Sequence, residues 1–349
     1  MPEIQLIIDG TAYMGWQELE VVRAIDAMAG RFKLRLTSIY PLPAPRGKEC
    51  ELFINGKQII SGYVFTVGVQ VTKSRHTLTV AGRDKTADLV DADVVMDSQE
   101  VHDLALKELV ETIIEPFGVT AIFETNPHEK FKKFSFQQES AFEAIERACR
   151  MRGVFPSGDE QGNLIIRAYG ATRAGTSLVM GENVLEASAN FDDTDRFSEY
   201  EVYGQQPGTD GVDSEAAAGP SGKAKDLGVT RYRPKIIVAE AAVDSGLAQQ
   251  RAEWEAAVRA AKAVGISVTV QDWSQTEGGD LWRENQLVKT VLPQHGINGD
   301  MLIREITYSL DSDQGTTATL ALVRPDAYKK QPDLEAEEQG IDKEEAEDE

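Results

Sequence analysis

The chain has 349 residues, with 36 Lys and Arg against 58 Asp and Glu, and a formal net charge of −22. Hydrophobic residues make up 41% and charged residues 27%, a globular composition long enough for two or three domains. The acidic balance argues against a surface that grips nucleic acid, because such a surface needs clustered Lys and Arg. Two cysteines, Cys50 and Cys149, are too few for a disulfide-stapled scaffold or a four-cysteine zinc site, and we interpret both as core residues. The N-terminus lacks a signal-peptide pattern, and no apolar run approaches the length of about 18 residues that membrane insertion requires.

Residues 1–96 predict a first small β-barrel domain. Asn55-Gly56 lies between two β-rich runs and is the strongest hairpin signal in the chain, because a type I′ turn needs positive φ at both central positions. Residues 76–84 (HTLTVAGRD) supply a further strand. Apolar residues also repeat with period two and face one side of a strand at Tyr63, Phe65, Val67, Val69 and Val71. Five or more strands without a long helical pattern are typical of a small barrel or sandwich.

Residues 97–180 predict an α+β domain with two helices and a hairpin. The segment 97–100 (DSQE) has the capping-box pattern and precedes a helical apolar stripe that stops at Pro116. The segment 140–143 (SAFE) repeats that pattern before a second helix. Residues 154–167 (VFPSGDEQGNLIIR) then predict a β-hairpin.

The C-terminal half predicts a second β-barrel domain from residues 181–203 and 264–328, where alternating strand patterns return. Residues 204–263 between them begin with a stretch rich in Gly, Ala, Pro and Ser at 204–226, predicted as a flexible loop, and continue as a strand-helix insertion. The predicted fold class is therefore mainly β with α+β insertions, built from two small β-barrel domains plus α+β domains.

Residues 329–349 are predicted to form a disordered acidic tail. The last 17 residues hold ten acids and one lysine, so this segment has no apolar period and repels itself. We interpret it as a solubilising terminus; the alternative is that it attracts a basic partner.

No motif anchors a catalytic, cofactor or metal site. The sequence contains no Walker loop, no Gly-x-Gly-x-x-Gly after a strand and no Gly-x-Ser-x-Gly elbow. With 58 acids some carboxylate pair is always available for glycoside hydrolysis, but no pair stands out by motif. The histidines are scattered, without a second ligand at metal-binding spacing: His76, His102, His128 and His295. We therefore predict no catalytic residues, no cofactor-binding residues, no metal ligands and no enzymatic activity.

Three charged segments have both a functional and a structural interpretation. Residues 311–315 (DSDQG) resemble half a calcium loop, but they lack its bidentate glutamate and lie where a hairpin turns. Residues 192–195 (DDTD) invite the same interpretation with the same objection. Arg83 and Lys85 in GRDKT are either a phosphate contact or charges at a strand end, solvated or paired with nearby Asp84 and Asp88. In each case we favour the structural interpretation.

Three segments of the chain resemble phage tail proteins. Residues 82–95 (GRDKTADLVDADVV) and 279–328 resemble the central baseplate hub protein of contractile-tailed phages of the Mu type. Residues 137–167 are similar to a Glu-Ser, helix, Arg-x-x-Gly, hairpin segment shared by tail hubs and VgrG-type spike proteins. In residues 279–328 the positions typical of this family are occupied by Trp282, Asn285, Pro293, Gly296, Ile297, Val323 and Pro325.

This resemblance implies a structural baseplate hub with phage tail hub (VgrG-hub-like) architecture. It implies a homotrimer whose two similar barrels per subunit form a ring of pseudo-sixfold symmetry, joining the sixfold tail tube to the threefold central spike. The implied partners are the tail tube protein, the central spike protein and other baseplate proteins, with DNA only in passage through the channel. The expected location is the virion tail baseplate, after assembly in the bacterial host cytoplasm.

Alternative functions have recognisable requirements. The hub of a pyocin or a secretion-type contractile injection device usually carries a fused needle, and nothing needle-like follows residue 328. A tail-associated cell-wall hydrolase requires a further domain with an acid and nucleophile or a zinc site, which the sequence does not show. A receptor-binding module is disfavoured because the sequence shows no cluster of aromatic residues suited to exposure.

Overall fold

The computed structural model describes residues 3–38, 46–96, 98–204, 221–238, 245–311 and 315–329, in two compact units. Unit 1 comprises Met1–Ser188 and Ile266–Leu322, and unit 2 comprises Ala189–Gly265 and Val323–Glu349. No helix in the described part of the chain combines the length and apolarity needed to cross a bilayer. The predicted acidic tail lies outside the described residues from position 330 onward.

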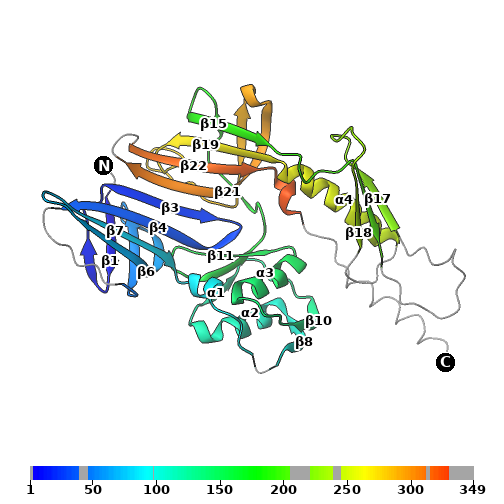
Figure 1. The fold of residues 1–349 in the computed structure, drawn as a ribbon, viewed down its shortest axis with the longest axis horizontal. Coiled ribbons are helices and arrows are strands. Elements are labelled where there is room, and N and C mark those ends of the chain that lie inside the picture. The colour runs from blue at the N-terminus through cyan, green and yellow to red at the C-terminus, as the bar shows by residue number, and fades with distance from the viewer. Residues whose placement is uncertain are drawn as a thin grey trace, which may run out of the picture. The chain divides into compact units, whose positions relative to one another are not determined.

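A sheet of 14 strands forms the body of unit 1 (Figure 1). Its N-terminal strands are β1 (Ile4–Ile8), β2 (Thr11–Tyr13), β3 (Glu18–Ala24), β4 (Ala27–Ser38), β5 (Glu49–Ile54), β6 (Lys57–Val71) and β7 (His76–Asp84). Its later strands are β13 (Thr172–Arg173), β14 (Leu178–Val179), β15 (Val184–Phe191), β19 (Val264–Gln271), β20 (Gln286–Leu292), β21 (Ile297–Asp311) and β22 (Gly315–Val323). The strand order is β15-β19-β22-β21-β3-β4-β7-β6-β5-β1-β2, and β20 pairs with β21, β13 and β14.

The sheet contains the same strand arrangement twice. The order β15-β19-β22-β21 repeats the order β3-β4-β7-β6, since both run first, second, fourth and third along the chain. β6 and β21 each have 15 residues, and β7 and β22 each have nine. β5 pairs with the first part of β6, and β20 pairs in the same way with the first part of β21. Two equivalent halves therefore lie edge to edge.

The mainly β class is confirmed, but the two predicted barrels are halves of one sheet. β21 pairs antiparallel with β3 over Glu305–Leu310 and Leu19–Ala24, so hydrogen bonding continues from one half to the other. The pairing of the described strands closes no barrel. Periodicity located the strands correctly, yet it carries no information about which edge meets which partner.

Local turn and strand signals were accurate in the first half. Asn55 and Gly56 have φ of 50° and 75°, as the predicted hairpin turn requires. The period-two stripe on β6 faces outward at its far end, because Phe65, Val69 and Val71 are exposed. The stripe therefore belongs to the surface of unit 1.

The α+β part of unit 1 packs its helices on short strands. Its elements are α1 (Ala87–Asp91), β8 (Glu100–Ala105), α2 (Leu106–Ile114), the 3-10 turn η1 (Glu115–Phe117), β9 (Ala121–Phe123), β10 (Lys130–Ser135), α3 (Ala141–Met151), β11 (Phe155–Gly158) and β12 (Leu164–Arg167). β11 and β12 form the predicted hairpin. The capping box of α3 is confirmed, since Ser140 Oγ accepts from Glu143 N at 3.2 Å and Glu143 Oε2 accepts from Ser140 N at 2.8 Å.

The start of the first predicted helix was wrong. α2 begins at Leu106, well after the DSQE segment, and Glu108 caps it by accepting from Ala105 N at 2.8 Å. Residues Glu100–Ala105 form β8, which pairs antiparallel with β10. Val101 and Leu104 pack against the core of this region from the strand. Their apolar spacing fits a helix equally well, so only the partner strand decided the outcome.

Unit 2 is a three-stranded sheet covered on one face by a helix. Its elements are β16 (Glu199–Tyr203), β17 (Ser221–Lys225), β18 (Pro234–Val238), α4 (Ser245–Lys262) and the 3-10 turn η3 (Pro325–Tyr328), and the strand order is β17-β16-β18. The core between sheet and helix consists of Tyr200, Val202, Leu247, Ala248 and Ala252. β16 pairs with β17 and β18, whereas the sequence placed it with the second barrel.

The predicted flexible stretch 204–226 is partly a strand. Its residues 221–225 form β17, and residues 205–220 lie outside the described residues. Gly222 faces α4 so closely that a Cβ there would lie 2.1 Å from Gln249 N. Glycine is therefore required at position 222 by the packing of α4.

Candidate functional site: a buried ionic junction

The segment Trp282–Asn285, just before β20, forms long-range contacts in unit 1. Trp282 is buried, its N donates to Trp273 O at 3.0 Å, and its carbonyl accepts from the Tyr308 hydroxyl. Arg283 Nη2 lies 3.0 Å from Glu160 Oε1 in the β11–β12 turn. The Trp of the family pattern is thus a core residue of the second half of the sheet.

Asn285 connects the same segment to the turn that follows β12. Its Nδ2 donates to Ala168 O at 2.9 Å, and its Oδ1 accepts from Gly170 N at 2.7 Å. Its φ of 65° lies in the left-handed region, which Asn adopts more readily than most residues. Both polar groups of the side chain are satisfied, so Asn is required here for hydrogen bonding and for backbone shape.

Arg23 and Glu284 form a buried ion pair that joins the two halves of the sheet. Arg23 on β3 is 8% exposed, and its Nε lies 3.5 Å from Glu284 Oε1. Arg23 Nη2 also donates to Gly158 O at the end of β11. One guanidinium therefore contacts the first half, the second half and the hairpin of the α+β region.

Asp84, the last residue of β7, lies beside this pair and is fully buried. Its Oδ2 accepts from Gly30 N at 2.6 Å, and its Oδ1 accepts from Thr86 N at 3.0 Å and Thr86 Oγ1 at 2.5 Å. A Cβ on Gly158 would lie 2.7 Å from Asp84 Oδ2. The hairpin approaches the carboxylate so closely that only glycine fits without displacement.

Burial and charge act in opposite directions on this cluster. Burial raises the pKa of Asp84 to about 6, although Arg23, Thr86 and Gly30 partly offset the rise. For Glu284 burial also favours the neutral form, but Arg23 and further interactions prevail and lower its pKa. Burial lowers the pKa of Arg23, and the attraction of Glu284 and Asp84 outweighs it, so the guanidinium stays charged. We call Arg23, Asp84, Thr86, Gly158 and Glu284 the ionic junction.

The ionic junction includes a residue that sequence analysis misinterpreted. Asp84 was treated as a surface partner for Arg83, whereas Arg83 pairs with Asp91 at 2.7 Å and Lys85 lies 3.9 Å from Glu49. The alternation of β7 provides the missed signal, because Asp84 has the same parity as buried Leu78 and Val80. A carboxylate on the apolar face of a strand needs a buried partner.

Reactive side chains are dispersed in the described residues. No group of three or more His, Cys, Asp or Glu there has the geometry to hold a metal ion. Asp193 pairs with Arg196 at 2.8 Å, and Asp192 accepts from Thr194 N at 2.9 Å, so both stabilise a turn. Part of the DSDQG segment, residues 312–314, lies outside the described residues.

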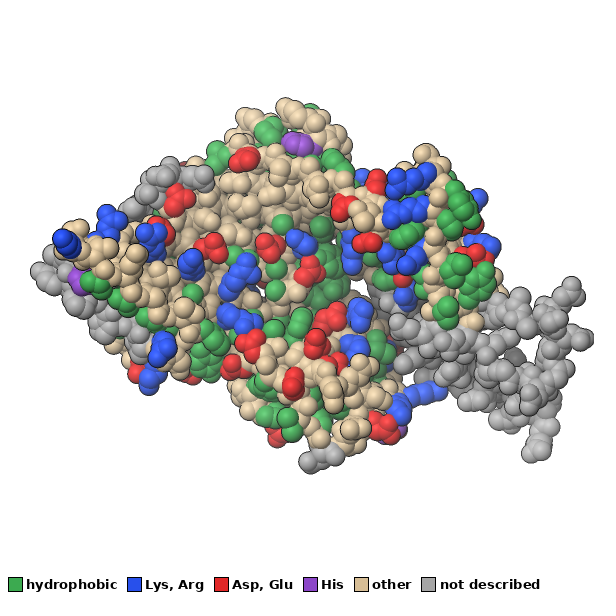
Figure 2. Space-filling view, viewed as in Figure 1, with side chains coloured by type: hydrophobic (Ala, Val, Ile, Leu, Met, Phe, Trp, Pro, Cys, Tyr) green, Lys and Arg blue, Asp and Glu red, His purple; other side chains and the backbone are tan. Residues whose placement is uncertain are grey.

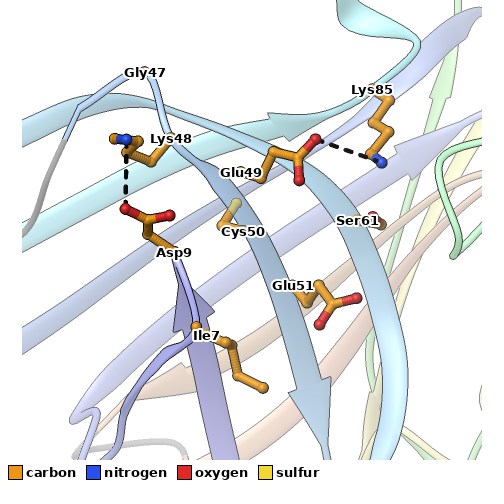
Figure 3. Close-up of a pocket in the computed structure, with 10 residues that line it drawn as sticks. Ile7, Asp9, Gly47, Lys48, Glu49, Cys50, Glu51, Ser61 and Lys85 are labelled. Atoms are coloured by element: carbon orange, nitrogen blue, oxygen red, sulfur yellow. Dashed lines mark ion pairs between the residues drawn. The ribbon is translucent and has the colours of Figure 1, made fainter. Parts of the chain in front are cut away.

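A polar pocket of about 560 Å³ lies beside β1, β5 and the start of β6 (Figure 3). Figure 3 shows two facing pairs of charged side chains, with Lys48 Nζ 3.4 Å from Asp9 Oδ2 and Lys85 paired with Glu49. Burial raises the pKa of the Cys50 thiol in its wall to about 12, so this thiol stays protonated and weakly nucleophilic. We therefore assign no nucleophilic role to this thiol.

Comparisons with known proteins assign the chain to a class. Four family models match in chain order: Mu phage baseplate assembly protein GpP-like, N-terminal (residues 3–84), baseplate hub protein gp44-like, second domain (86–168), tail protein NMB1110-like, third domain (196–254), and Mu phage baseplate assembly protein GpP, fourth domain (244–331). Each describes a phage baseplate or tail protein. The class is therefore that of structural phage tail proteins.

The relatives specify the family. The baseplate hub protein gp44 of Escherichia phage Mu is 33% identical over 339 residues, covering 93% of this chain and 88% of gp44. The 43 kDa tail protein of prophage MuSo2 from Shewanella oneidensis is similar in structure, with a TM-score of 0.84, 33% identity and coverage of 94% and 99% of the two chains. A type VI secretion component of E. coli, c3393, shares the fold at a TM-score of 0.55 and 9% identity, covering 91% and 76%.

The chain belongs to the Mu-like baseplate hub protein family. It is a structural component of a phage tail baseplate and not an enzyme, as predicted. The hub architecture and the relation to secretion-system spike proteins at the level of fold are also confirmed. The hydrolase alternative is wrong, because the matched relatives are structural.

Proposed function

We propose that three copies of this chain form a ring that joins the sixfold tail tube to the threefold central spike. The repeat in the sheet carries this proposal: β3-β4-β7-β6 and β15-β19-β22-β21 are two equivalent halves in one chain. Three chains then present six equivalent halves to a sixfold partner and three whole copies to a threefold partner. Closed rings of identical subunits need two different complementary surfaces on each copy.

Within this ring the ionic junction fixes the geometry of one subunit. Arg23 holds the two halves and the hairpin at one point, and Arg283 pairs with Glu160 beside it. A buried, charged contact tolerates only a narrow range of positions, because displacement leaves a charge unpaired. The spacing of the two halves is thereby kept constant, as an adaptor between symmetries requires.

The proposed ring has a central channel through which DNA passes during ejection. The net charge of −22 supports an acidic channel wall, since like charge repels the DNA backbone and prevents adhesion. A basic channel surface in a structure of the assembled ring would contradict this part of the proposal. Assembly would take place in the bacterial host cytoplasm, with the tail tube protein, the spike protein and other baseplate proteins as partners.

The direct test is the solution mass of the purified full chain, measured by light scattering behind a sizing column over a range of concentrations. A species of three times 38.3 kDa supports the ring and justifies imaging it by electron microscopy. If the chain is a monomer at every concentration, the same measurement is repeated with the spike protein. A monomer in both experiments contradicts the proposal.

A further inference from the structure

The sheet of unit 2 has one covered and one bare face. α4 packs on the face that carries Tyr200 and Val202. The register pairs Glu201 with Lys223 of β17 and with Ile236 of β18, so these three side chains lie in one row on the other face. No described residue of unit 2 forms a core on that side.

The bare face displays large apolar side chains on and beside its edge strand. Ile236 and Val238 on β18 are 63% and 60% exposed, and Tyr232 just before the strand is 88% exposed. Leu227, in the loop between β17 and β18, is 90% exposed. Single exposed apolar residues are common, but Ile236 and Val238 lie on the same side of one strand, and the adjoining loop adds Leu227 and Tyr232, a concentration of apolar exposure typical of an interaction site. We call the outer side of β16–β18 with the loop 226–233 the unit 2 face.

The loop of the unit 2 face is held in place by hydrogen bonds of Asp226 and Arg233. Asp226 receives two hydrogen bonds from Arg196, at 2.8 and 2.9 Å. Arg233 Nη1 donates to the carbonyls of Asp193 and Arg196, both at 2.9 Å. A loop fixed in this way loses little conformational entropy on binding, so its exposed Leu227 and Tyr232 are preorganised as anchors.

Charge indicates what covers the unit 2 face. Residues 221–238 carry five basic residues and one acidic residue, and β16 adds Glu199 and Glu201, so the strands and loop of unit 2 remain net basic in a chain of net charge −22. Figure 2 shows Lys and Arg beside hydrophobic side chains on the part that contains α4, β17 and β18. Residues 86–168, the hub family's second domain, carry 16 acidic and 8 basic residues. Another copy of this chain therefore offers a region of opposite net charge.

The arrangement of these charges disfavours a nucleic acid as the occupant. Glu199 and Glu201 lie along the central strand of the bare face, and Lys223 is paired with Glu201. A phosphate backbone would meet these carboxylates, and Ile236 and Val238 would gain nothing from it. Exposed aliphatic residues on β18, with Arg231 and Tyr232 in the loop directly before it, match the composition of protein–protein contacts.

We propose that the unit 2 face binds a second copy of this chain, against the acidic region of residues 86–168. This inference rests on the proposed trimer and identifies one of its two complementary surfaces. The contact is heterologous, because the unit 2 face and the acidic region are different parts of the same chain. Three such contacts close a ring.

The test compares two matched valines on strands. Val238→Ser and Val71→Ser each remove a valine side chain that is 60% exposed, one on the unit 2 face and one on β6. Light scattering of the full chain over a concentration series measures the concentration at which half of the trimers dissociate. We expect Val238→Ser and Tyr232→Ala to raise it by about tenfold or more, and Val71→Ser to leave it within about twofold.

The outcomes separate this inference from the proposed function. If the wild type is a trimer and Val238→Ser and Tyr232→Ala leave it intact, the inference is overturned and the proposed ring is retained. The same conclusion follows if Val71→Ser weakens the trimer as much as Val238→Ser does. A wild-type chain that stays monomeric with and without the spike overturns both. Binding of duplex DNA that Tyr232→Ala abolishes would assign the face to nucleic acid and also overturn the inference. Circular dichroism of each variant confirms that unit 2 remains folded.

A charge variant tests the complementary surface. Lys223→Glu with Lys225→Glu reverses two exposed charges on β17, and we expect it to weaken the trimer by about tenfold at low salt and by less at high salt. If the variant weakens the trimer equally at low and high salt, residues 86–168 are not the opposing surface.

Discussion

The ionic junction of unit 1 and the unit 2 face contain similar residue types in different environments. In the junction Arg23, Asp84 and Glu284 are buried, and each charge depends on the others. On the unit 2 face Lys223 and Lys225 are exposed, and the apolar side chains beside them have no covering layer among the described residues. The junction is thus complete within one chain, whereas the face, by our proposal, is completed by a second copy. Substitutions should separate the two: folding stability responds at the junction, and association responds at the face.

The largest effect is expected from Arg23→Met. This change leaves Glu284 and Asp84 as buried charges without their cation, and we expect a loss of about 3–5 kcal/mol in the free energy of unfolding. Denaturant titration measures it. The control is Arg35→Ala, which breaks the exposed pair with Glu18 and should cost about 1 kcal/mol or less. Equal losses in the two variants would show that burial of the junction contributes nothing.

Asp84→Asn should change how stability depends on pH. The folded pKa of Asp84, about 6, lies above its ordinary value of 3.8, so the native state holds this proton more tightly. The stabilisation of the folded state by this bound proton is fully present below pH 3.8 and is lost as the pH rises through about 6. Relative to Asp84→Asn, the free energy of unfolding of the wild type should therefore fall by up to about 3 kcal/mol between pH 4 and pH 7.

The pH experiment needs denaturant titrations of both proteins at matched pH values. Glu284 has a lowered pKa and contributes with the opposite sign, losing stability as the pH falls, but it is present in both proteins and cancels in the difference. Parallel stability curves for the wild type and Asp84→Asn would contradict the raised pKa.

Gly222→Ala tests how tightly α4 covers the sheet of unit 2. A Cβ would lie 2.1 Å from Gln249 N and 2.2 Å from Ala248 C, so the helix must move, at a cost of about 1–3 kcal/mol. Hydrogen exchange of β16 and α4 amides should accelerate. Gly299→Ala on β21 is the matched control, because its Cβ meets nothing within 4 Å. Unchanged exchange in β16 and α4 would mean that the helix does not pack on Gly222.

The smallest effect is expected from thiol reagents. Burial raises the pKa of both Cys50 and Cys149 far above the usual value, so the thiols are neutral as well as inaccessible. Iodoacetamide should label neither cysteine in the folded protein at neutral pH and both in denaturant, as mass spectrometry can measure. Rapid labelling of Cys50 alone would show that the pocket beside β5 opens.

The repeat has consequences for how substitutions in the sheet should be interpreted. β6 and β21 occupy equivalent positions, yet Phe65, Val69 and Val71 are exposed at the far end of β6, whereas Ile306, Tyr308 and Leu310 of β21 are buried. Equivalent strands therefore have different surroundings within one chain. In the proposed ring they would also face different neighbours, which accounts for different sequences on the same backbone arrangement.

The sequence predicted the local elements of this protein well. Asn55-Gly56 located a hairpin turn, and the SAFE segment located the start of α3, because these signals depend on neighbouring residues alone. Alternation located β7, β21 and β22 for the same reason. The motif at 282–297 indicated the family, although not what Trp282 and Asn285 contact.

Only the tertiary structure decided how these elements combine. The continuous sheet depends on β21 meeting β3, and the ionic junction brings Arg23 to Glu284 across 261 positions. β8 became a strand because β10 pairs with it, and β17 became a strand because β16 and α4 adjoin it. A residue's period and composition describe its neighbours along the chain, while pairing, burial and pKa depend on neighbours in space.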